Sequence, residues 1–262
     1  MNQTSTGESE AQRSVIRELV FEALLAIATL TLWPLLDDRE SGTVEERGRA
    51  LMFTPVIGLA LGVILTLIDR SLSSILGHGV RSFIVMILAS IAMLAQPWRG
   101  LGDTVDALRF GLRSAPTGLS RMGPLGALMA LLGFVSEVTL LARISDPSGR
   151  ACALILATML ARWSIVPVGY GLKPIERWGL GVPYEGGITF REFAVSSVIA
   201  IGLAMGLYAN VGLLTIVALA LAILGMRFLF SRRLGGASGY ALAGASALGE
   251  LVVILTIGLI VK

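Results

Sequence analysis

Residues 151–171 read ACALILATMLARWSIVPVGYG, and Arg162 is the single charged side chain among them. A segment that crosses the hydrocarbon core of a bilayer needs about 20 mostly apolar residues, which is the length of this stretch. Inside lipid each backbone N–H and C=O group must be bonded within its own segment, so a single apolar run of this kind forms a helix. The stretch therefore predicts a transmembrane helix with one buried charge.

Similar apolar runs occur along the whole chain of 262 residues, of which 55% are hydrophobic and 15% charged. We predict an all-α, polytopic integral membrane bundle of about seven to eight transmembrane helices. Residues 1–18 are predicted to be a polar N-terminal segment, and residues 19–262 a single transmembrane domain. The expected spans are 19–36, 52–69, 82–97, 124–142, 151–171, 194–209, 211–230 and 242–261.

Charge and cysteine content exclude several other classes of protein. The formal net charge of +3 is small enough to reflect membrane topology, so we expect the lipid bilayer as a partner and no nucleic acid. One cysteine and one histidine allow neither an internal disulfide nor a Cys/His metal cluster. The first 18 residues lack a convincing cleavage pattern, so no removable signal peptide is expected.

The loops of an eight-span bundle fall on two faces. One face takes residues 37–51, 98–123, 172–193 and 231–241, which together carry more Lys and Arg than the opposite face. The excess of basic residues predicts that this face is cytoplasmic and that the protein lies in the inner cell membrane.

An acidic pair stands in the polar stretch RGLGDTVDALRFG at residues 99–111. Asp103 and Asp106 are three residues apart, so they fall on one side if this stretch forms a helix. Two carboxylates at this spacing can share one Mg²⁺ that also binds substrate phosphates. The alternative is that the aspartates cap a helix or pair with Arg99 and Arg109.

Two glycine-containing segments precede predicted spans. The segment LSRMGPLG at residues 119–126 offers a hydroxyl, a guanidinium and backbone N–H groups at a helix start, which suits a phosphate oxygen, but it is also an ordinary helix N-terminus. The segment SRRLGGASGYALAGASALGE at residues 231–250 begins with two arginines and a glycine-rich loop. We interpret its small residues from Ala241 to Gly249 as mainly helix packing.

Four ionisable residues lie inside predicted spans, where burying a charge is costly: Glu137, Arg162, Arg227 and Glu250. Arg162 and Glu137 could form a structural pair. Glu250 and Arg162 could instead face a cavity that opens toward the cytoplasm. An ion-coupled transporter would use the same residue types.

Several of these stretches, in order, resemble the cobalamin synthase family. The family signature H-L-D-G-L-A-D-T-x-D-G is similar to PWRGLGDTVDA at residues 97–107, and its D-S-R-x-G-x-x-G segment is similar to LSRMGPLG. MFTPVIGLALG at residues 52–62 resembles the family's F-F-P-L-V-G-x-x-x-G entry segment. ARWSIVPVGYGLKP at residues 161–174 and RRLGGASGYALAGASALGE at residues 232–250 resemble two later motifs.

The chain departs from the family pattern at four acidic positions, which hold Arg99, Leu119, Tyr240 and Ala247. The motif positions of Asp103, Asp106 and Glu250 remain acidic. An arginine in place of a carboxylate opposes Mg²⁺ binding unless its side chain points to phosphate.

The resemblance implies a membrane enzyme that joins adenosylcobinamide-GDP to α-ribazole, or its phosphate, and releases GMP by Mg²⁺-dependent phosphoryl transfer. Asp103 and Asp106 would hold Mg²⁺, and Glu250 would orient a metal-bound water or the nucleophile. The implied substrate-binding residues are Ser120, Arg121, Arg162, Arg232, Arg233, Gly235 and Gly236. The missing carboxylates leave two alternatives open: an impaired homologue that acts as a membrane corrinoid-binding or scaffold protein, and a transferase for another diphosphate-linked substrate.

Overall fold

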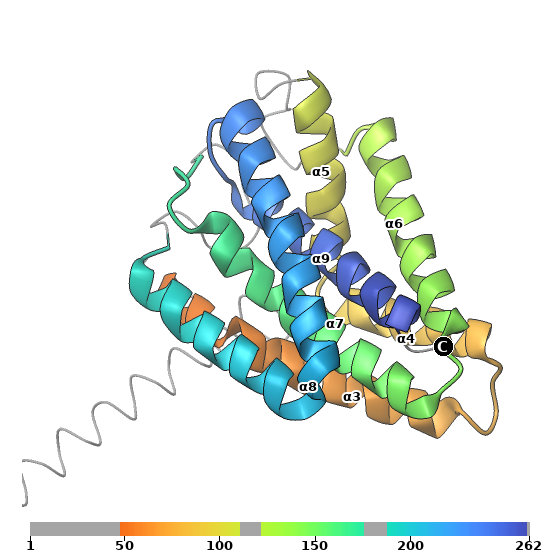
Figure 1. The fold of residues 1–262 in the computed structure, drawn as a ribbon. Helices are drawn as coiled ribbons and strands as arrows, with labels where there is room; N and C mark the ends of the chain where they lie inside the picture. Colours follow the sequence, from red (N-terminus) through yellow and green to blue (C-terminus); the bar gives the residue numbers. More distant parts are fainter. Residues whose placement is uncertain (1–47, 111–121, 176–187, 261–262) are drawn as a thin grey trace, which may run out of the picture.

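The computed structural model describes residues 48–110, 122–175 and 188–260, and these form a bundle of helices (Figure 1). A short 3₁₀ turn, η2 (Leu51–Phe53), precedes the first long helix. The helices are α3 (Thr54–Leu72), α4 (His78–Ala92), α5 (Gln96–Phe110), α6 (Pro124–Arg143), α7 (Pro147–Gly169), α8 (Phe190–Leu229), the π-helical turn η4 (Phe230–Leu234) and α9 (Gly239–Ile260). The predicted span 19–36 and the N-terminal segment 1–18 lie outside the described residues.

Helix α7 is the centre of the bundle. It contacts α3, α8 and α9, and its side chains are buried along nearly its whole length. Close helix approach explains this burial: a Cβ atom added to Gly58 of α3 would lie 2.7 Å from the Cα atom of Met159. Small residues at a crossing let two transmembrane backbones come together without a hydrophobic driving force between them. The stretch with which the sequence predicted a membrane fold is therefore the core of that fold.

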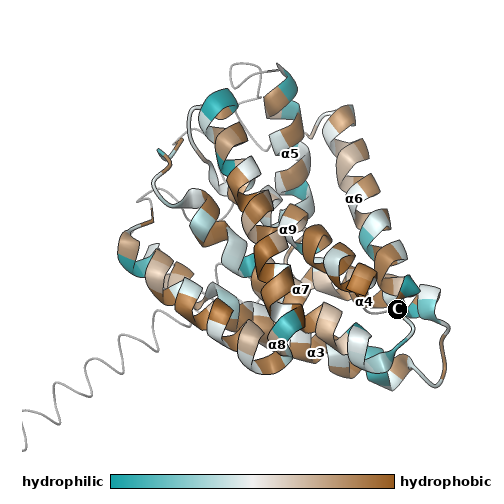
Figure 2. Cartoon of the chain, in the orientation of Figure 1, coloured by the Kyte–Doolittle hydropathy of each residue, from teal (hydrophilic) through white to brown (hydrophobic). Residues whose placement is uncertain are grey.

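The outer helices expose large apolar side chains, among them Leu131 of α6 and Leu221 of α8. Figure 2 shows the hydrophobic colouring along these two helices. In the described residues, five helices are long and apolar enough to cross a membrane, and six if the bent pair α4–α5 forms one span. Counting the two arms of α8 separately adds one to either number. The prediction of a polytopic helical membrane protein is confirmed.

Helix α8 reverses direction at Ala209, where the backbone φ is 38°. Its two arms run in opposite directions in Figure 1. They approach so closely beyond the turn that a Cβ atom on Gly212 would lie 2.7 Å from the carbonyl carbon of Ala204. The predicted division into spans 194–209 and 211–230 is therefore placed correctly.

The predicted span 82–97 needs correction because it is broken. Helix α4 ends at Ala92, α5 begins at Gln96, and the two are bent by 81°. Leu94 and Ala95 make the turn with φ values of 53° and 54°, and the Ala95 N–H donates to the Ser90 carbonyl at 2.7 Å.

Much of the predicted loop 98–123 is helical as well. Residues up to Phe110 belong to α5, which packs against α6 and α9. Hydropathy did not detect α5 because its glycines and aspartates make it polar, whereas tertiary packing stabilises it as a helix. Asp103 and Asp106 thus lie on a packed helix and not in an exposed loop.

The ends of several elements gather at one side of the bundle. The end of α5, the start of α6, the end of α7, the start of α8 and η4 all lie there, at the top and upper left of Figure 1. The prediction that the loops within 98–123, 172–193 and 231–241 share one face is confirmed for the described residues that border them. Most of the loop 37–51 lies outside those residues.

Gly100 of α5 and Gly244 of α9 form the contact that brings these two helices together. A Cβ atom on Gly100 would lie 2.5 Å from the Gly244 backbone nitrogen and would also overlap the Tyr240 carbonyl oxygen. We expect Gly100→Ala to destabilise the protein by about 1–3 kcal/mol, because backbone atoms cannot move aside as a flexible side chain can. Thermal melting in detergent measures the loss.

Gly202→Ala provides the matched control for this prediction. Gly202 also lies in a helix, but no atom lies within 4 Å of the position that its Cβ would take. The same change there should stabilise by about 0.4–1 kcal/mol, because alanine restricts the unfolded chain more than glycine does. Equal melting temperatures for the two variants would contradict the packing of α5 on α9.

Two arginines hold helix ends in place, the half-buried Arg227 and the fully buried Arg150. Arg227 of α8 donates through Nη1 to the carbonyls of Pro167 at 2.6 Å and Val168 at 3.1 Å, so it caps the end of α7. Arg150 of α7 forms a bidentate pair with Asp69 of α3 at the opposite side of the bundle. Arg227, a functional candidate in the sequence, is thus a helix cap in the structure.

Candidate functional site

The acidic pair of α5 lies where this helix meets α6 and α9. Asp103 is 7% exposed and Thr104 is 5% exposed, so both side chains are largely withdrawn from solvent. The spacing of three residues places Asp103 and Asp106 on neighbouring positions of one helix side. The sequence predicted a shared site on the condition that this stretch is helical, and the structure meets this condition.

Asp106 caps the start of α6. Its Oδ2 accepts the N–H of Gly123 at 2.7 Å, and its Oδ1 accepts the N–H of Gly126 at 3.0 Å. The capping role considered for these aspartates is confirmed for Asp106. The expectation that this helix start offers free N–H groups to phosphate is wrong for these two groups, because a carboxylate already occupies them. Ser120 and Arg121 lie outside the described residues.

Two of the positions that depart from the family pattern face each other beside Asp103. Tyr240 at the start of α9 interacts electrostatically with both Arg99 and Asp103 of α5. Ala247 lies on the same side of α9 as Tyr240 and Gly244, since residues four and seven positions apart share a helix face. Three of the four replacements therefore lie on α5 and α9, two helices that pack together, and the fourth, Leu119, lies outside the described residues.

The glycine-rich loop before α9 is fixed to the end of α7. The Ala237 N–H donates to the Lys173 carbonyl at 3.0 Å, and the Ile175 N–H donates to the Ala237 carbonyl at 2.9 Å. Gly235 has a φ of 72°, and a Cβ atom on Gly236 would overlap the Lys173 carbonyl. Both glycines are needed for this chain path, and a role in binding phosphate stays a prediction.

The arginines predicted to bind the diphosphate are solvent-exposed. Arg232 and Arg233 belong to η4, a segment that contacts α5 and α8. The Arg232 guanidinium lies 5.5 Å from the centre of the Phe228 ring. These two side chains are available to an anion next to α5.

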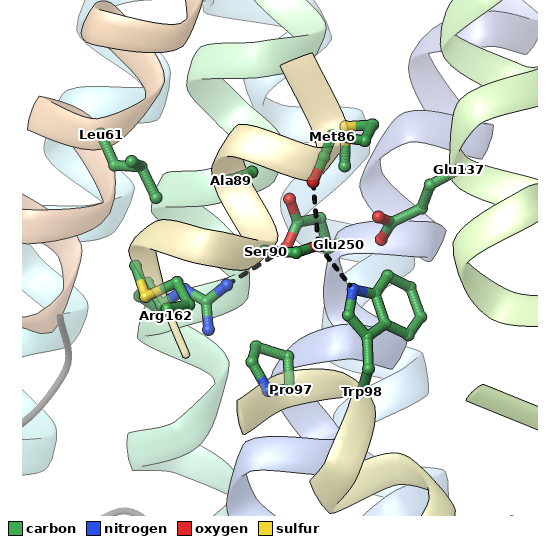
Figure 3. A pocket seen from close by; sticks show the side chains of 10 residues that line it. Leu61, Met86, Ala89, Ser90, Pro97, Trp98, Glu137, Arg162 and Glu250 are labelled. Carbon is green, nitrogen blue, oxygen red and sulfur yellow. Dashed lines mark hydrogen bonds and ion pairs between the residues drawn. The ribbon is translucent and has the colours of Figure 1, made fainter. Parts of the chain in front are cut away.

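Arg162 and Glu250 pair with each other inside the bundle. Arg162 Nη2 lies 3.2 Å from Glu250 Oε2, and Arg162 Nη1 donates to the Ser246 hydroxyl at 2.7 Å. Of the two possibilities considered for Arg162, an ion pair with Glu137 is not formed, because the arginine's ion-pair partner is Glu250. Glu137 lines the same small cavity, together with Ser90 and other residues of the helix break (Figure 3).

The structure thus separates the predicted site residues into two groups. Glu250 follows Tyr240 by ten residues along α9, which is about 15 Å of helix. Asp103, Asp106, Arg232 and Arg233 belong to elements that meet at one side of the bundle, whereas Arg162 and Glu250 form a buried network further along α9. The sequence offered helix capping by the aspartates as an alternative, but it did not reveal which helix Asp106 caps. It also did not reveal Gly100 as a helix contact, although a glycine-rich polar helix is itself a signal of close packing.

The donor set beside α5 fits a single magnesium ion that also takes oxygens from its substrate. Within residues 48–110, 122–175 and 188–260, no group of three or more His, Cys, Asp or Glu side chains is arranged to hold a metal. Mg²⁺ commonly binds through one or two carboxylates plus phosphates and water. Each Asp106 oxygen accepts one N–H and retains lone-pair capacity, so Asp103 and Asp106 could contribute one ligand each.

Comparison with known proteins gives the family. The sequence model described as cobalamin-5-phosphate synthase matches residues 22–258, which is most of the chain. The chain belongs to the cobalamin-5-phosphate synthase family. No solved structure matches it.

Curated relatives are similar to this chain over most of its length. Proteins named adenosylcobinamide-GDP ribazoletransferase include one from Geotalea daltonii, 28% identical over 81% of this chain and 87% of its own length. One from Rhizobium meliloti is 28% identical over 91% of this chain and 96% of its own length. A third, from Acetivibrio thermocellus, is 29% identical over 87% of this chain and 93% of its own length.

Proposed function

We propose that this family member joins adenosylcobinamide-GDP to α-ribazole, or to its phosphate, and releases GMP. The observation that carries the proposal is the meeting of three segments at one side of the bundle: acidic helix α5, the start of α6 and the η4–glycine loop before α9, which is far from the other two in sequence. The family model matches residues 22–258, a range that includes all three segments.

The reaction is a substitution at phosphorus. The ribazole hydroxyl oxygen forms a bond to the phosphorus next to the cobinamide arm, the bond to GMP breaks, and the hydroxyl proton is released. Such transfers depend on in-line placement and on neutralising charge more than on covalent chemistry. A helix that carries carboxylates beside a segment that carries arginines meets both needs.

Asp103 and Asp106 would hold Mg²⁺, which when bound neutralises charge on the diphosphate. Asp106 is held in place by its two hydrogen bonds to the start of α6. We assign the diphosphate to Arg232 and Arg233, because the guanidinium of Arg162 is already paired with Glu250. We further propose that this side of the bundle faces the cytoplasm at the inner membrane, where an amphiphilic corrinoid can reach it.

A binding or scaffold function is the second candidate. It is favoured by Arg99 and Tyr240, which place a positive charge and a phenol beside Asp103. A metal ion is required for the transferase function but not for a scaffold. Divalent-metal binding at α5 therefore separates the two.

The full chain in liposomes, supplied with adenosylcobinamide-GDP, α-ribazole and Mg²⁺, tests the proposal. We expect GMP and the cobalamin product in equal amounts, and neither after chelation of the metal. Chromatography of both products is the measurement. A folded sample that still binds the corrinoid but forms no product would overturn the transferase function and support the scaffold.

A further inference from the structure

A small pocket at the break between α4 and α5 is lined by two carboxyl groups and one guanidinium group. Glu137 of α6, Glu250 of α9 and Arg162 of α7 line it, and the other lining residues, on α3, α4, α5 and the break, are not titratable (Figure 3). Figure 3 shows Glu137 and Arg162 directed toward Glu250 from opposite sides. Arg162 forms its ion pair with Glu250, and the carboxyl oxygens of Glu137 have no hydrogen-bond partner among the described residues.

Glu137 is fully buried, and neither of its carboxyl oxygens has a hydrogen-bond partner in the described part of the chain. The Arg162 Nε atom also lacks one. An isolated ionised carboxylate in such surroundings is so unfavourable that the group is neutralised instead. The atoms without a partner are thus the two carboxyl oxygens of Glu137 and the Nε–H group of Arg162. A water molecule can bridge them by accepting a hydrogen bond from Arg162 and bonding to the Glu137 carboxyl group.

The size of the cavity limits what it can bind. About 10 Å³ is open to the centre of a water-sized sphere, which is close to the room needed by one water molecule and far too small for an organic substrate. A metal ion would neutralise Glu137 but could not accept a hydrogen bond from Arg162 Nε. A proton supplies the missing charge and takes no space.

We propose that this cavity is a proton-binding site: Glu137 is a neutral carboxylic acid in the folded protein and shares one water with the Arg162–Glu250 pair. Ser90 closes the site from α4 by accepting the Trp98 indole N–H at 3.3 Å and donating to the Met86 carbonyl at 2.8 Å. The site thus joins α4, α5, α6, α7 and α9 around a single exchangeable proton.

Infrared difference spectroscopy on the protein in liposomes tests the protonation directly. At neutral pH we expect the carbonyl band of a protonated carboxylic acid in the unmodified protein and its absence from Glu137→Gln. Loss of an ionised-carboxylate band in that variant would overturn the proposal.

Melting temperatures of three variants provide a second test. Glu137→Gln imitates the neutral acid and should change the melting temperature by less than about 2 °C. In Glu250→Gln, Glu137 can ionise and replace the lost partner of Arg162, so the loss should be small. The double variant leaves Arg162 without a carboxylate and should lose roughly 10 °C, far more than the sum of the single changes. Additive losses would contradict the proposal.

Exchange of the salt cation tests whether a proton or a metal ion neutralises Glu137. Replacing Na⁺ or K⁺ with N-methylglucamine at constant ionic strength should leave the melting temperature of the unmodified protein unchanged. A stabilisation by Na⁺ or K⁺ that disappears in Glu137→Gln would overturn the proton site in favour of a monovalent metal ion. None of these measurements depends on transferase activity.

Discussion

Replacing Asp103 with Asn should lower the Mg²⁺-dependent release of GMP by at least about 10²–10³-fold, which is the usual loss when one group that stabilises transition-state charge is removed. Asparagine keeps the size of the side chain and removes only its charge. Asp103 is 7% exposed and lies beside Tyr240 and Arg99, so the neutral variant also leaves the site more positive and less attractive to Mg²⁺. Initial rates at increasing Mg²⁺ concentrations measure both effects.

Asp146→Asn is the matched control for this prediction. Asp146 caps α7 by accepting the Gly149 N–H at 2.6 Å, and asparagine is an equally good cap. This change at the far side of the bundle should leave activity and the melting temperature unaltered. If Asp103→Asn turned over as fast as the unmodified protein, the assignment of the metal to this aspartate would be wrong.

The sequence predicts best those features that depend on local composition. The apolar runs that became α3, α6, α7, α9 and the two arms of α8 each satisfy the length that a bilayer requires, so their existence follows from hydropathy alone. The existence of the polar helix α5 did not follow from hydropathy. Residues distant in sequence, such as Gly244, stabilise this helix, and no hydropathy window over α5 contains them.

The candidate site shows the same limit at the level of single residues. The sequence indicated that Asp106 could cap a helix, but it could not identify the start of α6 as that helix, because only the packing of α5 against α6 determines which helix start the carboxylate meets. Arg162 of α7 had two possible carboxylate partners, Glu137 of α6 and Glu250 of α9. Which of them it binds depends on how these helices pack in the bundle. Pairing between distant helices is a tertiary property.

Asp69 also pairs with residues of distant helices, and it is the charged residue whose replacement we expect to destabilise the protein most. Its Oδ1 lies 2.6 Å from Arg150 Nη2 and 3.1 Å from Arg81 Nε, and its Oδ2 accepts from Arg150 Nε at 3.1 Å. Arg150 is 0% exposed and also donates to the carbonyl of Leu141 at 2.7 Å. One carboxylate therefore compensates two buried guanidinium groups from α4 and α7.

We expect Asp69→Asn to destabilise the protein by about 3–5 kcal/mol, because removing one member of a buried ion pair leaves the other charge uncompensated. For a chain of this size the melting temperature should fall by roughly 10 °C. Thermal melting in detergent measures this loss. Activity per folded molecule should be unchanged, since Asp69 pairs with Arg81 of α4 and Arg150 of α7 and not with the residues around Asp103 on α5.

Arg81→Gln shows whether charge compensation is the cause. Alone, this change leaves the bidentate Asp69–Arg150 pair intact and should cost less than Asp69→Asn. Combined with Asp69→Asn, it removes one of the two uncompensated guanidinium groups, so the double variant should be more stable than the sum of the single losses predicts. If the two losses simply add, Asp69 stabilises the fold through packing or hydrogen-bond geometry, and the buried charges of α4 and α7 do not depend on it.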